Sequence, residues 1–337
     1  MTEKKPFLIM VKPNGSLCNM RCRYCYYIGN EVSVRNVMQE EVLETMIRNY
    51  FESAVSDTVS FVWHGGEPTL SGLEFYRKAV KLQKKYLPEG MQCWNNLQTN
   101  GLLLDEEWCS FLKEENFDVG ISVDGTRMIH DAYRKDAQGN VTYERIRRNV
   151  QLLQKYGVQP DLLCTVSEET TKDPYQVYNS LKHFRNGWIQ FIPIVNHDEH
   201  WNVDAYSVSA ESYGRFLCEI FRLWLTHDFG RVNIQLFLEL LNVYNGGTAS
   251  LCNFSETCGR ALVVESSGAV YSCDHFVKEE CYLGNVTENS LLEMAYGVKQ
   301  DAFGRRKKDG LSVKCQNCPY LFFCHGECLK NRSEERR

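Results

Sequence analysis

Between residues 7 and 195 the chain alternates short β-branched or aromatic runs with segments of helical periodicity. Apolar runs that are bounded by turn residues indicate buried strands. The predicted strands are Phe7–Lys12, Thr58–Trp63, Cys93–Gln98, Phe117–Val123, Asp161–Val166 and Trp188–Ile194. The predicted helices between them are Gln39–Ala54, Gly72–Tyr86, Asp105–Glu115, Val141–Tyr156 and Pro174–Phe184.

These six strand–helix repeats predict an α/β fold with a parallel sheet and right-handed crossovers. Asp105 and Asp173 are predicted helix N-caps, and Gly157 fits the end of another helix. Two architectures stay open at this point, an open doubly wound sheet and a partial (β/α)6 barrel of TIM-like shape. In both, ligands bind at the carboxyl ends of the strands.

Short polar motifs follow five of the predicted strands. They are Cys18–Cys25, His64–Pro68, Thr99–Gly101, Ser122–Gly125 and Pro193–Val195. Each motif alone is equally typical of an ordinary turn, because Gly-Gly, Asn-Gly and Asp-Gly are common turn sequences. Gathered at one edge of a parallel sheet, the five motifs predict a binding site.

The pattern changes after residue 209. Two further helices are predicted at Tyr213–Thr226 and Asn233–Tyr244, and Asn245-Gly-Gly247 ends the second one. Residues 252–337 are rich in cysteine and turns and lack long periodic segments. We therefore predict a domain boundary near residue 248, with a barrel and its following helices at 1–247 and a second domain at 248–337.

Composition narrows the function classes. The 337-residue chain has a net charge of -5. Nothing in this charge suggests binding to nucleic acid or to an anionic membrane. Its longest apolar runs, such as Phe7–Val11 and Phe191–Val195, are far too short to span a bilayer. We expect a cytoplasmic protein without nucleic-acid or membrane partners. Since disulfides are disfavoured in the cytosol, its 15 cysteines indicate metal binding or redox chemistry.

Three cysteines follow the first predicted strand with the spacing Cys18-x3-Cys22-x2-Cys25. Structural zinc sites and ordinary [4Fe–4S] clusters take four protein ligands. A cluster held by only three thiolates leaves one iron open to bind another group. Zinc and free thiols are the alternatives. A zinc ion would need a fourth ligand, and the nearest histidine in sequence is His64, on another loop.

A second group of cysteines lies in the predicted C-terminal domain. It comprises Cys252, Cys258, Cys273, Cys315, Cys318, Cys324 and Cys328. The last four cysteines alone are also typical of a zinc ribbon. With the three earlier cysteines in the same domain, two cages of four ligands each are the better account.

The first motif, with Tyr24 before its last cysteine, resembles the signature of radical S-adenosylmethionine (SAM) enzymes. The resemblance implies that the fold is the partial (β/α)6 barrel of these enzymes. It also implies a [4Fe–4S] cluster on Cys18, Cys22 and Cys25 whose open iron binds the methionine end of SAM. In that family the reduced cluster cleaves SAM to a 5′-deoxyadenosyl radical, which abstracts hydrogen. The motif Gly65-Gly-Glu-Pro68 is similar to the family's motif for the methionine amino group.

The same resemblance implies a set of contacts with SAM. They are Gly66 and Glu67 at the methionine amino group, Ser122 and Arg134 at the ribose and carboxylate, and Val195 and Tyr24 at the adenine. Glycines suit the first contact because they let the backbone approach closely. For Arg134, a solvated charge at a helix end is the alternative.

The second group of cysteines resembles a SPASM domain, which holds two auxiliary [4Fe–4S] clusters. By this resemblance the first cage comprises Cys252, Cys258, Cys273 and Cys328. The second cage comprises Cys315, Cys318, Cys324 and a cysteine downstream of Cys328. Since no cysteine follows Cys328, we expect the C-terminal end to be truncated. The spare Cys281 is expected at the start of a strand.

The stretches Val270–Phe276, Trp63–Leu70 and Gln190–Pro193 resemble the anaerobic sulfatase-maturating enzymes. The resemblance implies oxidation of a Cys or Ser residue to formylglycine in an unfolded sulfatase precursor of Cys/Ser-x-Pro/Ala-x-Arg type. Asp274 would be the general base for the S–H or O–H proton, and a turn-capping Asp is the alternative. A reduced flavodoxin or ferredoxin-like protein would supply electrons. His64 is expected near the reaction centre.

Two other functions stay open at this point. A radical enzyme that crosslinks or epimerises a ribosomal peptide would use the same clusters with different peptide contacts. An iron–sulfur electron carrier or a structural zinc protein would have no need for the Gly-Gly-Glu-Pro motif, Ser122 and Arg134. Nothing in the sequence demands more than a monomer.

Overall fold

The computed structural model describes residues 5–30, 32–184, 187–197, 203–204 and 206–332. Its first strands are β1 (Leu8–Lys12), β2 (Thr58–Trp63), β3 (Gln92–Thr99), β4 (Asp118–Ser122), β5 (Asp161–Val166) and β6 (Trp188–Pro193). Its first helices are α1 (Glu40–Glu52), α2 (Leu73–Tyr86), α3 (Glu106–Glu114), α4 (Arg127–Tyr133), α5 (Tyr143–Lys155) and α6 (Pro174–Lys182). The predicted strands and helices of this region are confirmed, and α4 is an addition that the sequence pattern did not predict.

The later elements are less regular. The helices are α7 (Ala210–Leu223), α8 (Gln235–Tyr244), α9 (Leu291–Tyr296), α10 (Val298–Asp309), α11 (Val313–Gln316) and α12 (Leu321–Cys324). The strands are β7 (Asn233–Ile234), β8 (Ala261–Glu265), β9 (Ala269–Tyr271) and β10 (Tyr282–Asn285). The helix predicted from Asn233 starts two residues later, because Asn233 and Ile234 pair with β6. Among the described residues, no helix is long and apolar enough to cross a membrane.

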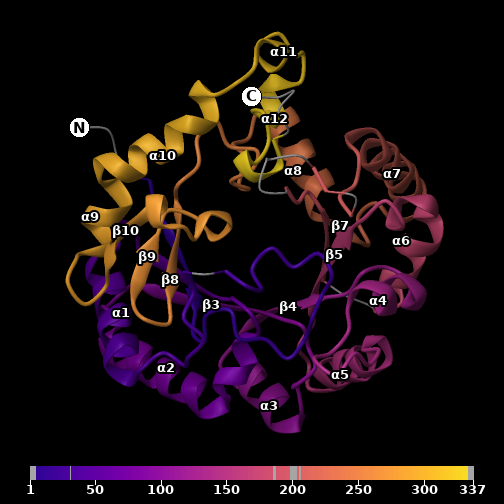
Figure 1. The fold of residues 1–337 in the computed structure, drawn as a ribbon. Coiled ribbons are helices and arrows are strands. Elements are labelled where there is room, and N and C mark those ends of the chain that lie inside the picture. Colours follow the sequence, from indigo (N-terminus) through magenta and orange to yellow (C-terminus); the bar gives the residue numbers. More distant parts are fainter. Residues whose placement is uncertain (1–4, 31, 185–186, 198–202, 205, 333–337) are drawn as a thin grey trace.

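Within the described residues, ten strands form one sheet in the order β10-β9-β8-β1-β2-β3-β4-β5-β6-β7. Strands β1 to β6 pair in parallel, each with the next. Figure 1 shows the strands curving into an arc with α1 to α7 around its outside. In the described part of the chain the edge strands β10 and β7 do not pair with each other, so the barrel is partial. The partial barrel is therefore confirmed over the open doubly wound sheet.

The sheet continues past the predicted boundary near residue 248. Strand β8 pairs in parallel with β1 from Leu8 opposite Ala261 to Lys12 opposite Glu265. Strands β9 and β10 then add two antiparallel partners. This pairing places the ends of β1 and β8 side by side at the carboxyl edge of the barrel. The division into residues 1–247 and 248–337 stays a prediction.

Local capping explains where two outer helices begin. The Asp105 carboxylate accepts a hydrogen bond from the N–H of Trp108 at 2.9 Å. The Asp173 carboxylate accepts one from the N–H of Gln176 at 2.9 Å, and Pro174 occupies the first helical position. These side chains satisfy backbone donors that a helix start leaves free, so both predicted N-caps are confirmed.

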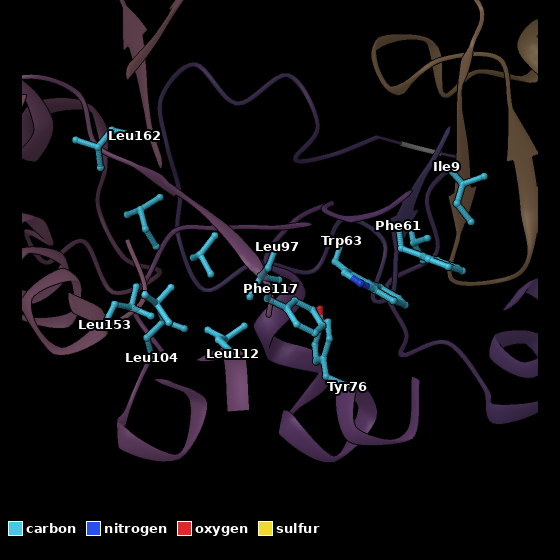
Figure 2. Close-up of a cluster of buried hydrophobic side chains, with 14 of the residues drawn as sticks. Ile9, Phe61, Trp63, Tyr76, Leu97, Leu104, Leu112, Phe117, Leu153 and Leu162 are labelled. Carbon is cyan, nitrogen blue, oxygen red and sulfur yellow. The ribbon is translucent and has the colours of Figure 1, made fainter. Parts of the chain in front are cut away.

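The main core lies between the sheet and the outer helices (Figure 2). On β2 the rings of Phe61 and Trp63 stack with their centroids 5.8 Å apart. Tyr76 of α2 meets the Trp63 ring edge-on at 5.4 Å, and the Trp63 indole N–H donates to Asn95 at 2.8 Å. Phe61, Trp63 and Tyr76 are completely buried. This aromatic contact fixes α2 against β2 and so fixes the loop between them.

We predict that Trp63→Ala lowers the free energy of unfolding by about 3–5 kcal/mol, because it opens a cavity and leaves Asn95 without its indole partner. The matched control is Trp94→Ala on the neighbouring strand, where Trp94 is 47% exposed. We expect that control to change the free energy by less than about 0.5 kcal/mol. Anaerobic urea denaturation of the two variants checks this prediction. Equal losses in both would contradict this assignment of the core.

Candidate active site

The segment after β1 carries the three clustered cysteines and lies inside the arc of strands (Figure 1). The N–H of Gly66 donates to the carbonyl of Gly15 at 2.9 Å, and that of Glu67 donates to the carbonyl of Leu17 at 2.8 Å. A Cβ atom on Gly66 would lie 2.2 Å from the Leu17 carbonyl oxygen, so only glycine fits there. The Gly-Gly motif after β2 therefore holds the cysteine segment by close backbone contact.

Glu67 is buried and ties two loops together. Its carboxylate accepts hydrogen bonds from the N–H of Thr69 at 3.0 Å, the Thr99 hydroxyl at 2.6 Å and the Asn100 N–H at 2.8 Å. Burial raises the pKa of Glu67, and these hydrogen bonds oppose that rise. The carboxylate thus joins the loops after β2 and β3, and its predicted contact with the SAM amino group stays a prediction.

Cys18, Cys22 and Cys25 are free, half-buried thiols, and Cys22 and Cys25 lie near enough to Cys18 to affect its ionisation. Burial raises the pKa of Cys18 to about 12, and charges on Glu67, Cys22 and Cys25 raise it further. Burial also raises the pKa of Cys22 to about 11. Metal ligands must be thiolates, so these thiols need a cationic group to ionise. Among the described residues, no three His, Cys, Asp or Glu side chains are grouped to hold a single metal ion.

Asp124 organises the side of the site that faces the cysteine segment. It accepts hydrogen bonds from Nε of Arg134 at 2.9 Å, from the Tyr24 hydroxyl and from the Thr165 N–H at 3.1 Å. Arg134 is buried, with Nη1 4.0 Å from Sγ of Cys22 and its guanidinium 5.5 Å from the Tyr24 ring centroid. The alternative of a solvated charge at Arg134 is therefore wrong. A buried guanidinium here fits a carboxylate ligand.

Ser122 and Val195 lie at the carboxyl ends of β4 and β6, on the same edge of the barrel. The Ser122 hydroxyl accepts a hydrogen bond from Nε2 of Gln98 at 3.1 Å. The Val195 carbonyl accepts one from Nζ of Lys330 at 2.7 Å. The C-terminal segment thus reaches the barrel edge, and the predicted SAM contacts of Ser122 and Val195 stay predictions.

Asp274 lies in a short 3₁₀ turn after β9 and is buried. One carboxylate oxygen is 2.7 Å from Nζ of Lys12 and 4.0 Å from Nδ1 of His64, and the other accepts a hydrogen bond from the Tyr26 hydroxyl. Burial alone would raise the pKa of Asp274, but the Lys12 ammonium, followed by His64 and His275, brings it well below its usual range. Asp274 is therefore held as a carboxylate.

Lys12, the last residue of β1, is completely buried. Its Nζ lies 3.3 Å from the ring centroid of Tyr27 and 4.0 Å from Oε1 of Glu265. Glu265 accepts hydrogen bonds from the Tyr27 hydroxyl at 2.6 Å and the Ser33 hydroxyl at 2.9 Å. Lys12 is thus one cation shared by two carboxylates, of which Asp274 is the nearer, and the Tyr27 ring adds a cation–π contact.

Four cysteines of the C-terminal segment converge beside Asp274. They are Cys252, Cys258, Cys273 and Cys328, the set predicted for the first auxiliary cage. Burial raises the pKa of Cys328 to about 12, and charges on Cys252 and Cys258 raise it further. Burial, followed by charges on Cys328 and Cys252, raises the pKa of Cys273. Four thiols that interact in this way, three of them half-buried and that of Cys252 exposed, fit a four-thiolate cluster. The cage adjoins Asp274 because Cys273 precedes it.

Two of the remaining cysteines of the segment lie on short helices, and Cys318 lies between those helices. Cys315 is in α11, Cys324 ends α12, and the N–H of Cys318 donates to the Cys315 carbonyl at 3.1 Å. Cys281 is buried directly before β10, as predicted, with Nη2 of Arg306 3.9 Å from its Sγ. The fourth ligand of the second set is unassigned.

Comparisons with known proteins agree with this geometry. Residues 15–181 match the radical SAM superfamily, and residues 252–319 match SPASM, an iron-sulfur cluster-binding domain. The serine-type anaerobic sulfatase-maturating enzyme of Bacteroides thetaiotaomicron is 40% identical over 97% of this chain and 84% of its own length. This chain belongs to the anaerobic sulfatase-maturating enzyme family. Its cofactors are accordingly SAM and iron–sulfur clusters, and it is a radical SAM oxidoreductase.

Further members of the family support the assignment. The cysteine-type enzyme of Clostridium perfringens is 35% identical over 98% of this chain and 90% of its own length. A solved structure described as native anSMEcpe with bound AdoMet has a TM-score of 0.90 at 34% identity, covering 98% of this chain and 92% of that one. The relatives of this sulfatase-maturating enzyme thus include enzymes named serine-type and enzymes named cysteine-type.

The site contains residues that the sequence did not single out. Lys12, Asp124 and Tyr26 hold the predicted site residues in place, and each has a signal in the sequence. Lys12 is a charged residue that ends an apolar strand, Asp124 lies inside a motif at the end of β4, and Tyr26 directly follows Cys25. Their partners come from distant parts of the chain, so only the fold identifies their roles.

We predict that the cysteine groups proposed to hold clusters take up about four irons each. After anaerobic reconstitution, replacing Cys18, Cys22 and Cys25 together by Ala should remove about four irons per chain and abolish release of 5′-deoxyadenosine. Replacing the exposed Cys218 by Ala is the control and should leave the iron content unchanged. Iron and sulfide assays with quantitative chromatography check this. A protein that takes up zinc and no iron would overturn the assignment.

Proposed function

We propose that this chain oxidises one Cys or Ser side chain of an unfolded sulfatase precursor to Cα-formylglycine. The observation that carries the proposal is the buried Asp274 carboxylate, held ionised by Lys12 beside the first auxiliary cage. The relatives named serine-type and cysteine-type enzymes support it. So do solved relatives described with AdoMet and a bound peptide. The proposed target segment is of Cys/Ser-x-Pro/Ala-x-Arg type.

In this proposal Cys18, Cys22 and Cys25 hold the cluster that binds SAM, and the cage at Cys252 holds an auxiliary cluster. When bound, these groups supply a 5′-deoxyadenosyl radical that abstracts hydrogen and an acceptor for one electron. The chain's own contribution is to orient SAM. The residues proposed for this are Gly66, Glu67, Ser122, Arg134, Val195 and Tyr24.

Asp274 is the proposed general base. As the β-hydrogen leaves the substrate residue, Asp274 accepts the S–H or O–H proton. Loss of a hydrogen atom, a proton and one electron amounts to a two-electron oxidation, which gives an aldehyde from Ser and a thioaldehyde from Cys. Water then converts the thioaldehyde to the aldehyde with release of hydrogen sulfide. His64, 4.0 Å from Asp274, is proposed to contact the peptide on the same side.

The setting of the enzyme is also proposed from its chemistry. The proposed electron donor is a reduced flavodoxin or ferredoxin-like protein. We propose that the enzyme is located in the cytoplasm and is a monomer. Reduced clusters and many free thiols suit a reducing compartment. The proposed domain division is a barrel unit at 1–247 and a SPASM unit at 248–337.

A peptide that contains Cys-x-Pro-x-Arg tests the proposed function. With reductant and SAM, mass spectrometry should detect an aldehyde product, and Asp274→Asn should lower its formation by about 10²–10⁴-fold while iron content stays unchanged. Asp301→Asn, which removes a half-exposed carboxylate on α10, is the matched control and should retain activity. A crosslinked or epimerised peptide without aldehyde would favour a peptide-modifying enzyme instead.

Lys12→Met should change the pH dependence of the reaction. Lys12 lowers the pKa of Asp274, so the wild-type carboxylate stays ionised as the pH falls towards 5. Without that cation the pKa of the buried carboxyl rises, and kcat/KM should fall with decreasing pH along an acid limb between about pH 4 and 7. Lys78→Met, which removes an exposed lysine paired with Glu40, is the control. Identical pH profiles for the three proteins would contradict this role of Lys12.

A further inference from the structure

A second buried lysine lies beside the auxiliary cage and has no role in the reaction described above. Lys307 of α10 is 1% exposed. Its Nζ donates hydrogen bonds to the carbonyls of Cys252 at 3.0 Å, Asn253 at 2.8 Å and Ser255. An ammonium has three N–H donors and a neutral amine has two, so three carbonyl partners hold the group in its charged form.

The charge of Lys307 acts directly on the cage. The Lys307 Nζ contacts the backbone carbonyl of Cys252, a predicted cluster ligand, so the ammonium lies at the edge of the cage. Burying an ammonium is costly unless a counter-charge is near. Four thiolates that hold an iron–sulfur cluster carry a net negative charge and so provide that counter-charge.

We propose that Lys307 is a positioning residue that raises the reduction potential of the auxiliary cluster held by Cys252, Cys258, Cys273 and Cys328. Adding one electron makes the cluster more negative, and a buried cation beside its ligands stabilises that reduced form. In the oxidation of the substrate, the proton goes to Asp274 and the electron to this cluster. Lys307 favours the transfer of the electron to the cluster, so this part of the inference depends on the proposed function.

The neighbouring residue provides a matched control. Lys308 is also on α10, but its side chain is 55% exposed and its Nζ pairs with Glu256 at 2.8 Å. Removing the charge of Lys308 changes the net charge of the protein by the same amount as removing that of Lys307. Only the loss of the Lys307 charge should change the reduction potential of the cage, because solvent screens the charge of the exposed Lys308.

The test compares K307Q, K307R and K308Q with a reference protein that keeps both lysines. All four carry Ala at Cys18, Cys22 and Cys25, so that only auxiliary clusters remain. After anaerobic reconstitution, iron content is measured, and an EPR-monitored redox titration gives the midpoint potentials. The signal of the cage is identified by its loss in Cys273→Ser. We expect a more negative midpoint in K307Q, an unchanged one in K308Q and one close to the reference protein in K307R, which keeps the charge.

Each outcome decides the proposal. A cage midpoint that is unchanged in K307Q at full iron content would overturn it. So would a K307Q protein that loses the cage's iron while K307R keeps it, since Lys307 would then build the cage and not tune it. With Cys18, Cys22 and Cys25 restored, K307Q should still form 5′-deoxyadenosine but yield less aldehyde per turnover. If the wild type itself gives no aldehyde, the proposed function is wrong. The midpoint potentials of K307Q and K308Q still decide whether Lys307 raises the reduction potential of the cluster.

Discussion

The ion pair between Lys12 and Asp274 joins two parts of the chain that are far apart in sequence. Lys12 ends β1, and Asp274 follows β9, so the 2.7 Å contact exists only because β8 pairs in parallel with β1. A buried cation and carboxylate stabilise the fold only when each keeps its partner. Here the pair also fixes the protonation state of the proposed base. The same contact therefore serves the packing of the C-terminal segment and the chemistry.

Buried carboxylates recur as the organising groups of the site. Glu67 accepts hydrogen bonds from the loop after β3, and Asp124 orients Tyr24 and Arg134 towards the cysteine segment. Because parallel strands end at one edge, each carboxylate reaches donors on neighbouring loops. A cation lies beside two of the cysteine groups, since Arg134 is near Sγ of Cys22 and Lys307 donates to the carbonyl of Cys252. The chain thus prepares positive surroundings for groups of net negative charge.

Local patterns in the sequence were sufficient to predict the parallel sheet with its outer helices, but they left the partial barrel and the open sheet both possible. The strands Thr58–Trp63 and Asp161–Val166 match the prediction at both ends, because alternating burial and clear turn residues define them. Strand β8 (Ala261–Glu265) was missed, because it lies in the cysteine-rich region and its pairing with β1 depends on distant residues. The cysteine sets followed from spacing and resemblance. Lys12, in contrast, gains its role only through a tertiary contact that no local pattern encodes.

In the proposed reaction the radical takes a hydrogen from the β-carbon of the substrate residue, and Asp274 takes the proton of the same side chain. A peptide whose target Cys or Ser carries deuterium at the β-carbon tests this most directly, with 5′-deoxyadenosine and peptide analysed by mass spectrometry. One deuterium should enter 5′-deoxyadenosine for each aldehyde formed, and the aldehyde should keep the other. Deuterium-free 5′-deoxyadenosine, with both deuterium atoms still on the peptide, would contradict it.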